Sequence, residues 1–245
     1  PTLLSEEIHK AESSIERLKA EGSLPLLTGE REEGYYCDND GSYQPFLRYL
    51  PEAARKGRKL PLLVYLHGYS PYLNILNWSG FPSNLVEFAE RKGLCLVEPF
   101  GRSNTDFQGI GEQDVLTVIA EMVKRHSIDE DRIILAGHSM GGMGVWTIGS
   151  HHPDLFAGLL IIAGRGDYYF WQNVNRDDLP EYKQRLIDAE FAASHLPNLK
   201  DIPIFSFHGG ADSLIPVEEG RHIAEAVRRW FQAHRKRRCC IGSGP

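Results

Sequence analysis

The sequence has few cysteines and no long apolar run. No stretch approaches the roughly 18 consecutive apolar residues that a membrane-spanning helix needs. Cys37 and Cys95 are isolated, while Cys239 and Cys240 are adjacent, so the cysteines have no metal-binding spacing and we expect buried or incidental thiols. The amino terminus is charged and amphipathic, unlike a signal peptide. Because the chain begins with proline instead of methionine, cytoplasmic and secreted locations both remain open.

The net charge of −6 is unevenly distributed. Six basic residues and no acidic residue lie between positions 228 and 238, so the rest of the chain is more acidic than the total suggests. A basic cluster can bind nucleic acid or an anionic membrane, but an acidic body repels both. We therefore expect no nucleic-acid partner and no membrane partner, and a solvated basic tail at 234–245.

The composition predicts one globular domain spanning residues 1–245. Hydrophobic residues make up 42% of the chain and aromatic residues 10%, which is enough for a substantial core. Within this domain the sequence predicts a helical extension at 1–33 and a small cap-like insertion at 165–195. There is no internal repeat and no low-complexity segment.

Strand and helix patterns alternate along most of the chain. We expect an antiparallel hairpin first, because Asn39-Asp40-Gly41 forms a turn signal between two β-prone runs. The continuous apolar run at 60–66 is typical of a strand buried on both faces. The predicted strands are 35–37, 43–50, 60–66, 94–97, 133–136, 159–163 and 202–207, and the predicted helices are 2–21, 84–91, 112–124, one ending near 150, 181–193 and one from Pro216 to about Ala233. This order predicts a mostly parallel α/β sheet with helices on both faces and the hairpin at its N-terminal edge.

A glycine-rich turn with one serine follows the apolar run at 133–136. Gly137, Ser139 and Gly141 match the pattern Gly-x-Ser-x-Gly, with a strand before it and a small-residue helix start after it. In that context the pattern is a nucleophile elbow, because the serine must sit on a strained turn and bulkier flanking residues would collide. The sequence therefore predicts Ser139 as a nucleophile; the alternative is an ordinary glycine-rich turn.

Two other strand ends carry candidate residues, and ligands of open parallel sheets gather at such carboxyl ends. The run at 60–66 turns before Tyr69, whose backbone amide is predicted to form an oxyanion hole with that of Met140. The alternative is a tight turn. Asp212 follows the strand at 202–207 and has the chain position of a triad acid; the alternative is a turn or helix-cap aspartate.

Three segments resemble the α/β-hydrolase superfamily: LHGY at 66–69, GHSMGG at 137–142 and HGGADSLIP at 208–216. The resemblance covers roughly residues 34–232. Within it, DGSYQPFLRYLPE, PLLVYLHGY, DEDRIILAGHSMGGMGVW and HPDLFAG are similar to the prolyl-oligopeptidase-like and feruloyl-esterase-like branch of single-domain esterases.

The resemblance implies hydrolysis of carboxylic esters through an acyl-enzyme on Ser139. It implies Asp212 as the acid, the amides of Tyr69 and Met140 as the oxyanion hole, and neither a metal nor an organic cofactor. Together with the elbow, Asp212 and the oxyanion turn, it leads us to expect a small or carbohydrate-linked carboxylic ester as the substrate.

The sequence does not supply an evident histidine for a triad. The pattern requires a histidine after the acid, and only His222 and His234 follow Asp212. His222 falls inside the last predicted helix, and His234 lies about 27 Å along that helix, at the wrong face of the sheet. The expected last strand is missing or altered. Three explanations remain: a truncated or frame-altered chain, which we favour because the pattern is regular through Val227, a base supplied by another protomer, or a noncatalytic relative.

Four consecutive aromatic residues, Tyr168, Tyr169, Phe170 and Trp171, follow the strand at 159–163. They are expected to form a stacking wall for an aromatic acyl group or a sugar ring, and the alternative is a locally packed loop. The leading hypothesis is a serine esterase. A prolyl-oligopeptidase-like peptidase with the same nucleophile and a catalytically silent binding scaffold are the alternatives, and the oligomeric state is left open.

Overall fold

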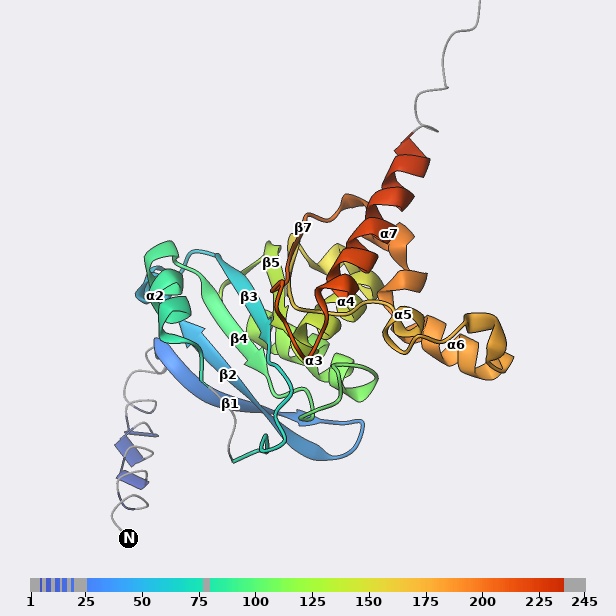
Figure 1. Cartoon of the computed structure of the whole chain (residues 1–245). Helices are drawn as coiled ribbons and strands as arrows, with labels where there is room; N and C mark the ends of the chain where they lie inside the picture. The colour runs from blue at the N-terminus through green and yellow to red at the C-terminus, as the bar shows by residue number, and fades with distance from the viewer. Residues whose placement is uncertain are drawn as a thin grey trace, which may run out of the picture.

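The structure, a computed structural model, describes residues 26–76 and 80–235 and scattered positions before residue 20. Most of the predicted N-terminal helix at 2–21 and the tail after Arg235 lie outside the described residues. The described strands form one seven-stranded sheet with the order β1-β2-β4-β3-β5-β6-β7 (Figure 1). Strands β3 to β7 run parallel, and β1 and β2 are antiparallel to their neighbours. This architecture confirms the predicted α/β fold class.

The strands lie close to their predicted positions. They are β1 Gly29–Cys37, β2 Ser42–Leu50, β3 Leu60–Leu66, β4 Cys95–Pro99, β5 Ile128–His138, β6 Gly158–Ile162 and β7 Ile204–Phe207. β1 starts earlier than expected, so residues 29–33 belong to the hairpin and not to the N-terminal extension. β5 also starts earlier than predicted, at Ile128. Its first pairing with β3 joins Ile128 to Leu60, and the regular pairing begins after a shift in register, at Leu62 with Ile133.

The helices connect these strands. They are α2 Ser83–Lys92, α3 Ile110–Arg125, α4 Met140–His151, α5 Tyr168–Trp171, α6 Glu181–Glu190 and α7 Val217–Arg235, with short 3-10 turns at Glu52–Lys56, Pro153–Leu155, Arg176–Asp178, Ala192–Ser194 and Leu196–Asp201. The predicted cap-like insertion at 165–195 contains α5 and α6, which project to one side of the sheet below α7 in Figure 1. None of the helices in the described ranges is long and apolar enough to cross a membrane.

Side chains of β3 alternate between two buried faces of the sheet. Leu62, Val64 and Leu66 face the larger core, which includes residues of α3, α4 and α7. Leu63 faces the smaller core beneath α2. Period-two alternation with both faces covered explains why this strand reads as a continuous apolar run. The sheet's covered faces leave its carboxyl ends as the edge where side chains can gather.

A buried carboxylate joins α3 to the end of α4. Glu112 accepts hydrogen bonds from His151 Nδ1 at 2.9 Å and from His152 Nε2 at 2.9 Å. Burial acts to raise the pKa of Glu112, but the hydrogen bonds and charges of the two histidines outweigh burial and lower it. The bond to Glu112 in turn raises the pKa of His151. Because α4 begins next to Ser139, this contact fixes the far end of the helix that carries the elbow.

Glu112→Gln is expected to destabilise the protein by about 2 kcal/mol near pH 6, because it leaves a half-buried histidine charge without its partner. A lowered Glu112 pKa contributes stability above pH 4.5, the ordinary carboxyl value, and loses it as pH falls. A raised His151 pKa contributes stability below pH 6.5 and loses it as pH rises through the folded value. Urea unfolding should therefore show the difference shrinking toward pH 9.

Glu121→Gln is the matched control for this pH dependence. Glu121 accepts a hydrogen bond from Arg125 Nε at 2.7 Å, and an arginine does not titrate in this range. Its effect on unfolding should be the same at pH 6 and pH 9. A Glu112→Gln effect that is equally flat would contradict the coupling to His151.

Candidate functional site

Ser139 occupies a strained turn between β5 and α4. Its backbone φ is 56° and its ψ is −116°, and α4 begins at the next residue, Met140. The Ser139 amide donates to the carbonyl of Ile162 at 2.9 Å, so the turn is bonded to the carboxyl end of β6. A non-glycine residue with positive φ outside a regular element is costly and persists only where the surroundings impose it. The predicted strand, sharp turn and helix are therefore present at this serine.

Two glycines allow this turn to form. A Cβ on Gly137 would lie 2.3 Å from the carbonyl oxygen of Gly141, and a Cβ on Gly141 would lie 2.0 Å from that of Leu66. Both neighbours are backbone atoms, which cannot swing aside like the end of a flexible side chain. The first turn of α4 thus packs directly against β5 and the end of β3.

Backbone strain gathers at the carboxyl ends of the central strands. Seven non-glycine residues among those described have positive φ, and six of them follow β4, β5 or β6: Arg102, Ser103, Asp106, Phe107, Ser139 and Ala163. Strained residues of this kind cluster at functional sites. These strained residues therefore lie at the same edge of the sheet as the Ser139 turn.

The backbone amides of Tyr69 and Met140 come from neighbouring strand ends. A Cβ on Gly68 would lie 3.1 Å from His138 Nδ1, so the turn after β3 runs alongside the turn after β5. In the part of the chain that the structure describes, neither amide has a hydrogen-bond partner. Met140 is also the first residue of α4, where the helix leaves its first amides unpaired.

Asp212 lies in the loop between β7 and α7. Its Oδ1 accepts from the amides of Leu214 at 2.9 Å and Ile215 at 3.0 Å, and these bonds lower the pKa of Asp212. Its Oδ2 lies 3.7 Å from His208 Nε2, too far for a hydrogen bond, and that nitrogen bonds to the Ile215 carbonyl at 2.8 Å instead. Asp212 is therefore an ionised carboxylate that is held through Oδ1, while its Oδ2 contacts His208 without a hydrogen bond.

The histidines near this edge have other partners. His67 is buried, and its Nε2 bonds to the Phe100 carbonyl at 3.1 Å. His222 lies within α7, as expected, and its Nε2 bonds to Asp167 at 2.9 Å while its ring stacks on Phe170. Among the described residues, none bonds to the Ser139 hydroxyl. No described residue is therefore hydrogen-bonded to the nucleophile as a base.

The four consecutive aromatic residues face different partners. The Tyr168 ring packs edge-on against Phe191, and the Tyr169 hydroxyl donates to Asp188 at 2.9 Å. Phe170 stacks on the His222 ring, with 3.9 Å between the ring centroids. Of these four rings, only that of Trp171 contacts a charged group near the carboxyl ends of the strands, the Arg165 guanidinium. The geometry therefore favours local packing for three of the four, and Trp171 is the best placed of them to meet a ligand.

Sequence reasoning missed a cation at this edge. Arg165 lies three residues after the end of β6. Its guanidinium forms an ion pair with Asp106 at 3.3 Å and lies 4.6 Å from the centre of the Trp171 ring. Its Nε is buried and has no hydrogen-bond partner among the described residues. Burial of Asp106 raises the pKa of that carboxyl despite the arginine. No local pattern signals this group, because its members come from loops 59 residues apart.

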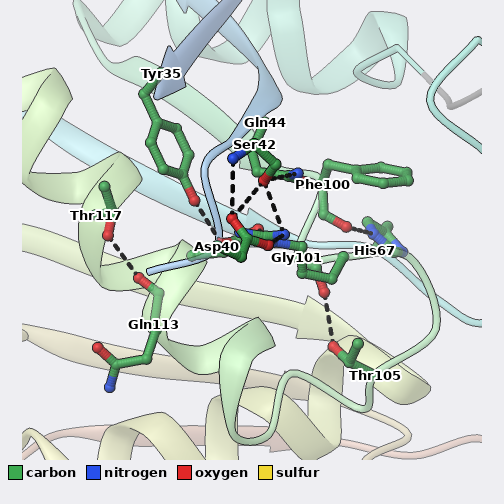
Figure 2. Close-up of polar contacts among 12 residues, drawn as sticks. Tyr35, Asp40, Ser42, Gln44, His67, Phe100, Gly101, Thr105, Gln113 and Thr117 are labelled. Carbon is green, nitrogen blue, oxygen red and sulfur yellow. Dashed lines mark hydrogen bonds and ion pairs between the residues drawn. The ribbon is translucent and has the colours of Figure 1, made fainter. Parts of the chain in front are cut away.

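A polar network holds the strained loop after β4. Arg102 donates to Asp114 at 2.9 Å and to Asp40 at 2.5 Å, linking the hairpin turn to α3. The Tyr35 hydroxyl donates to the same Asp114. The Thr105 hydroxyl donates to the Gly101 carbonyl at 2.7 Å (Figure 2). The loop that presents Asp106 and Phe107 is therefore fixed from two sides.

A mostly parallel sheet with a serine on a positive-φ turn between a central strand and a helix defines the α/β-hydrolase fold. The sequence also matches the prolyl oligopeptidase family over residues 104–237, more than half of the chain. The chain belongs to this family, and so to the hydrolases of the serine esterase and peptidase type. The predicted superfamily is confirmed, whereas the feruloyl-esterase-like branch stays a prediction.

Individual relatives include both peptidases and esterases. The chain is 32% identical to dipeptidyl-peptidase 5 of Porphyromonas gingivalis over 127 residues, which cover 47% of this chain and 18% of that protein. It is 23% identical to esterase YjfP of Escherichia coli, over 75% of this chain and 80% of the relative. The structure of fluorophosphonate-binding serine hydrolase F of Staphylococcus aureus, substrate bound, has a TM-score of 0.62 at 17% identity, covering 84% of this chain and 88% of that one, a likeness that shows the fold.

Gly141→Ala is expected to destabilise the protein by about 3 kcal/mol or more, because the added methyl group overlaps backbone atoms of β3. Gly210→Ala is the matched control, since a Cβ there meets nothing within 4 Å. Thermal unfolding of the two variants measures the difference. Equal unfolding temperatures would contradict the close approach of α4 to β3.

Proposed function

We propose that the protein hydrolyses carboxylic esters through an acyl-enzyme on Ser139. The observation that carries the proposal is the positive-φ turn at Ser139, which places one half-buried serine where β5 meets α4. Membership of the prolyl oligopeptidase family and the likeness to esterase YjfP support the same reaction type. Ester hydrolysis is preferred to amide hydrolysis because an alkoxide is a far better leaving group than an amide anion, so ester cleavage depends less on a general acid.

The proposed reaction begins when the Ser139 oxygen attacks the ester carbonyl and transfers its proton to a base. The amides of Tyr69 and Met140 would donate to the oxyanion, with the positive end of the α4 dipole behind Met140. Collapse of the tetrahedral intermediate breaks the bond to the alcohol, which takes up the proton, and leaves acyl-Ser139. Water then repeats the sequence and releases the carboxylic acid.

Asp212 is proposed as the group that orients the base. Its Oδ2, which makes no hydrogen bond to His208 at 3.7 Å, can accept an N–H from an imidazole, while the two amide bonds to Oδ1 keep the carboxylate ionised and fixed. No histidine in the described ranges occupies that position. A serine site without its histidine retains only about 10³ to 10⁴-fold catalysis over water, so we expect acyl transfer to Ser139 with slow turnover by the isolated chain.

A fluorophosphonate probe and a panel of p-nitrophenyl acetate and butyrate test this proposal. We expect the probe to label Ser139, identified by peptide mass, and Ser139→Ala to lose both labelling and ester cleavage. Added imidazole should raise the turnover of the unmodified protein well above the sum of the imidazole rate and the Ser139→Ala rate, because it replaces the base. Asp212→Asn should reduce the response to imidazole.

Circular dichroism of each variant controls for folding. A folded protein that is not labelled at Ser139, and whose ester cleavage equals that of Ser139→Ala, would refute the esterase proposal. Turnover as fast without imidazole as with it would instead refute the absence of a base and leave the nucleophile assignment intact.

For the substrate, we propose an ester with an aromatic acyl group or a sugar ring that stacks on Trp171. The ring already holds the Arg165 guanidinium, so it presents an electron-rich face to this edge. Trp171→Ala should raise the KM for an aromatic-acyl ester about 5-fold and leave that for the acetate unchanged, as expected when about 1 kcal/mol of stacking is lost. Tyr182→Ala, which removes an exposed aromatic ring of α6, is the matched control. Equal KM changes for both esters would contradict the stacking role.

A second candidate is peptide hydrolysis with the same nucleophile. The family match and the 32% identity to a dipeptidyl-peptidase favour it. Cleavage of a proline-containing dipeptide amide that depends on Ser139, without cleavage of the p-nitrophenyl esters, would replace the esterase proposal with this one.

A further inference from the structure

Two loops approach the first turn of α4 from opposite sides. Gly142 packs on the loop after β6, since a Cβ there would lie 2.9 Å from Gly164 Cα. Gly144 packs on the loop after β4, since a Cβ there would lie 2.7 Å from Phe107 Cβ. Residues two positions apart on a helix point in nearly opposite directions, because successive residues turn by about 100°. The two loops therefore flank the helix that begins directly after Ser139.

An ion pair joins these two loops. Arg165, in the loop after β6, donates through Nη2 to Oδ2 of Asp106, in the loop after β4, at 3.3 Å. The sheet order places β3 and β5 between β4 and β6, so the pair bridges across the strand ends that carry Tyr69 and Ser139. Both loops meet α4 within about 7.5 Å of Ser139 along the helix axis. A substrate bound at the serine therefore lies close to this ion pair.

Both members of the pair have unused hydrogen-bonding capacity. Among the described residues, Arg165 uses only its donor to Asp106, and its Nε is buried without a partner. Asp106 accepts this bond through Oδ2, while its Oδ1 accepts none from the described residues. The side chains of Arg165 and Asp106 are 21% and 40% exposed, so a ligand can reach them. Because buried polar groups in proteins normally have partners, unused donors and acceptors side by side indicate a binding site.

The charges around the pair decide which class of ligand fits. Glu219, in the first turn of α7, is 6% exposed, and its side chain has no hydrogen-bond partner among the described residues. Burial raises the pKa of Glu219, and the nearby charges of His222 and Arg165 oppose that rise. Two carboxyl groups around one guanidinium leave no excess positive charge for an anion. The guanidinium also lies against the Trp171 ring, the aromatic face that a cation would need. The cluster therefore favours a neutral ligand.

A pair of neighbouring hydroxyl groups matches this arrangement, because a hydroxyl both donates and accepts. One hydroxyl can donate to Oδ1 of Asp106 while the next accepts from Nη1 of Arg165. We propose that Asp106 and Arg165 form a subsite, beside Trp171, for a neutral vicinal diol on the substrate. The inference rests on the proposed ester hydrolysis at Ser139 and names the chemistry that the ester must carry. The diol belongs either to a dihydroxyphenyl ring on the acyl side or to a sugar on the alcohol side.

Binding to the Ser139→Ala protein tests the subsite without turnover. The probes are methyl 3,4-dihydroxybenzoate and methyl xyloside, each compared by NMR titration with its O-methylated counterpart. We expect a diol to bind about 10-fold more tightly than its counterpart, because methylation removes the donors to Asp106. A preference for the benzoate assigns the diol to the acyl group, and a preference for the xyloside assigns it to the alcohol.

Substitutions in the Ser139→Ala background locate the preference. Asp106→Asn should abolish it, and asparagine adopts the positive φ of this position readily, so the loop keeps its shape. Arg165→Lys should also abolish it, because lysine lacks the planar fork of donors. Asp188→Asn is the matched control: Asp188 pairs with Arg176 at 2.5 Å within the cap-like insertion, and its loss should leave the preference unchanged. Circular dichroism controls for folding.

Equal affinities within both probe pairs, or a preference that survives Asp106→Asn and Arg165→Lys, would overturn the subsite. Tighter binding of methyl 4-carboxybenzoate than of either diol would also overturn it and assign the cluster to anions. These readouts separate the subsite from the reaction. A diol preference in a protein whose Ser139 resists the fluorophosphonate probe would refute only the esterase proposal, and labelling of Ser139 without a diol preference would refute only the subsite.

Discussion

The site depends on the close approach of the first turn of α4 to the ends of β3 and β5. Gly141 has no room for a Cβ against the Leu66 carbonyl, and Gly137 has none against Gly141. This contact forces the residue between them, Ser139, into a conformation with positive φ that L-residues avoid. The strained backbone of Ser139 is thus a consequence of backbone packing, and the surrounding packing compensates the cost of about 1 to 3 kcal/mol for such a residue.

The surrounding packing is arranged to bear that strain. Phe107, itself at positive φ, is fully buried and packs so closely on α4 that a Cβ on Gly144 would lie 2.7 Å from it. The loop that carries Phe107 is held by Arg102, which bonds to both Asp40 and Asp114. The hairpin at the edge of the sheet therefore stabilises the far side of the elbow, although it contributes no residue to the candidate site.

Local patterns in the sequence predicted the parts of the fold that local physics determines. The apolar run at 60–66 matches β3, and the glycine spacing around Ser139 matches the elbow, because both depend on neighbours in the chain. The start of β1 was missed since its exposed residues are mostly charged. Local patterns did not predict contacts between distant segments. The Arg165–Asp106 contact joins residues 59 positions apart, and the His222–Asp167 contact joins residues 55 positions apart. Trp171, which packs on Arg165, lies on a short turn without periodicity. The four consecutive aromatic residues of α5 illustrate the same limit. Their sequence suggests one aromatic surface, but successive residues of the helix point in different directions and contact different partners.

Asp212 and Ser139 lie at the same edge of the sheet, and no described residue bonds to the Ser139 hydroxyl. The loop that carries Asp212 begins where β7 ends. The carboxylate is held through Oδ1 by two amides, while its Oδ2 lies 3.7 Å from His208 Nε2 and accepts no hydrogen bond from the described residues. His222 is the α7 histidine nearest the start of that helix, but its Nε2 is bound to Asp167 and its ring is stacked on Phe170. Among the described residues, the chemistry of Ser139 therefore depends on whether a donor can reach Oδ2 of Asp212 at the end of β7.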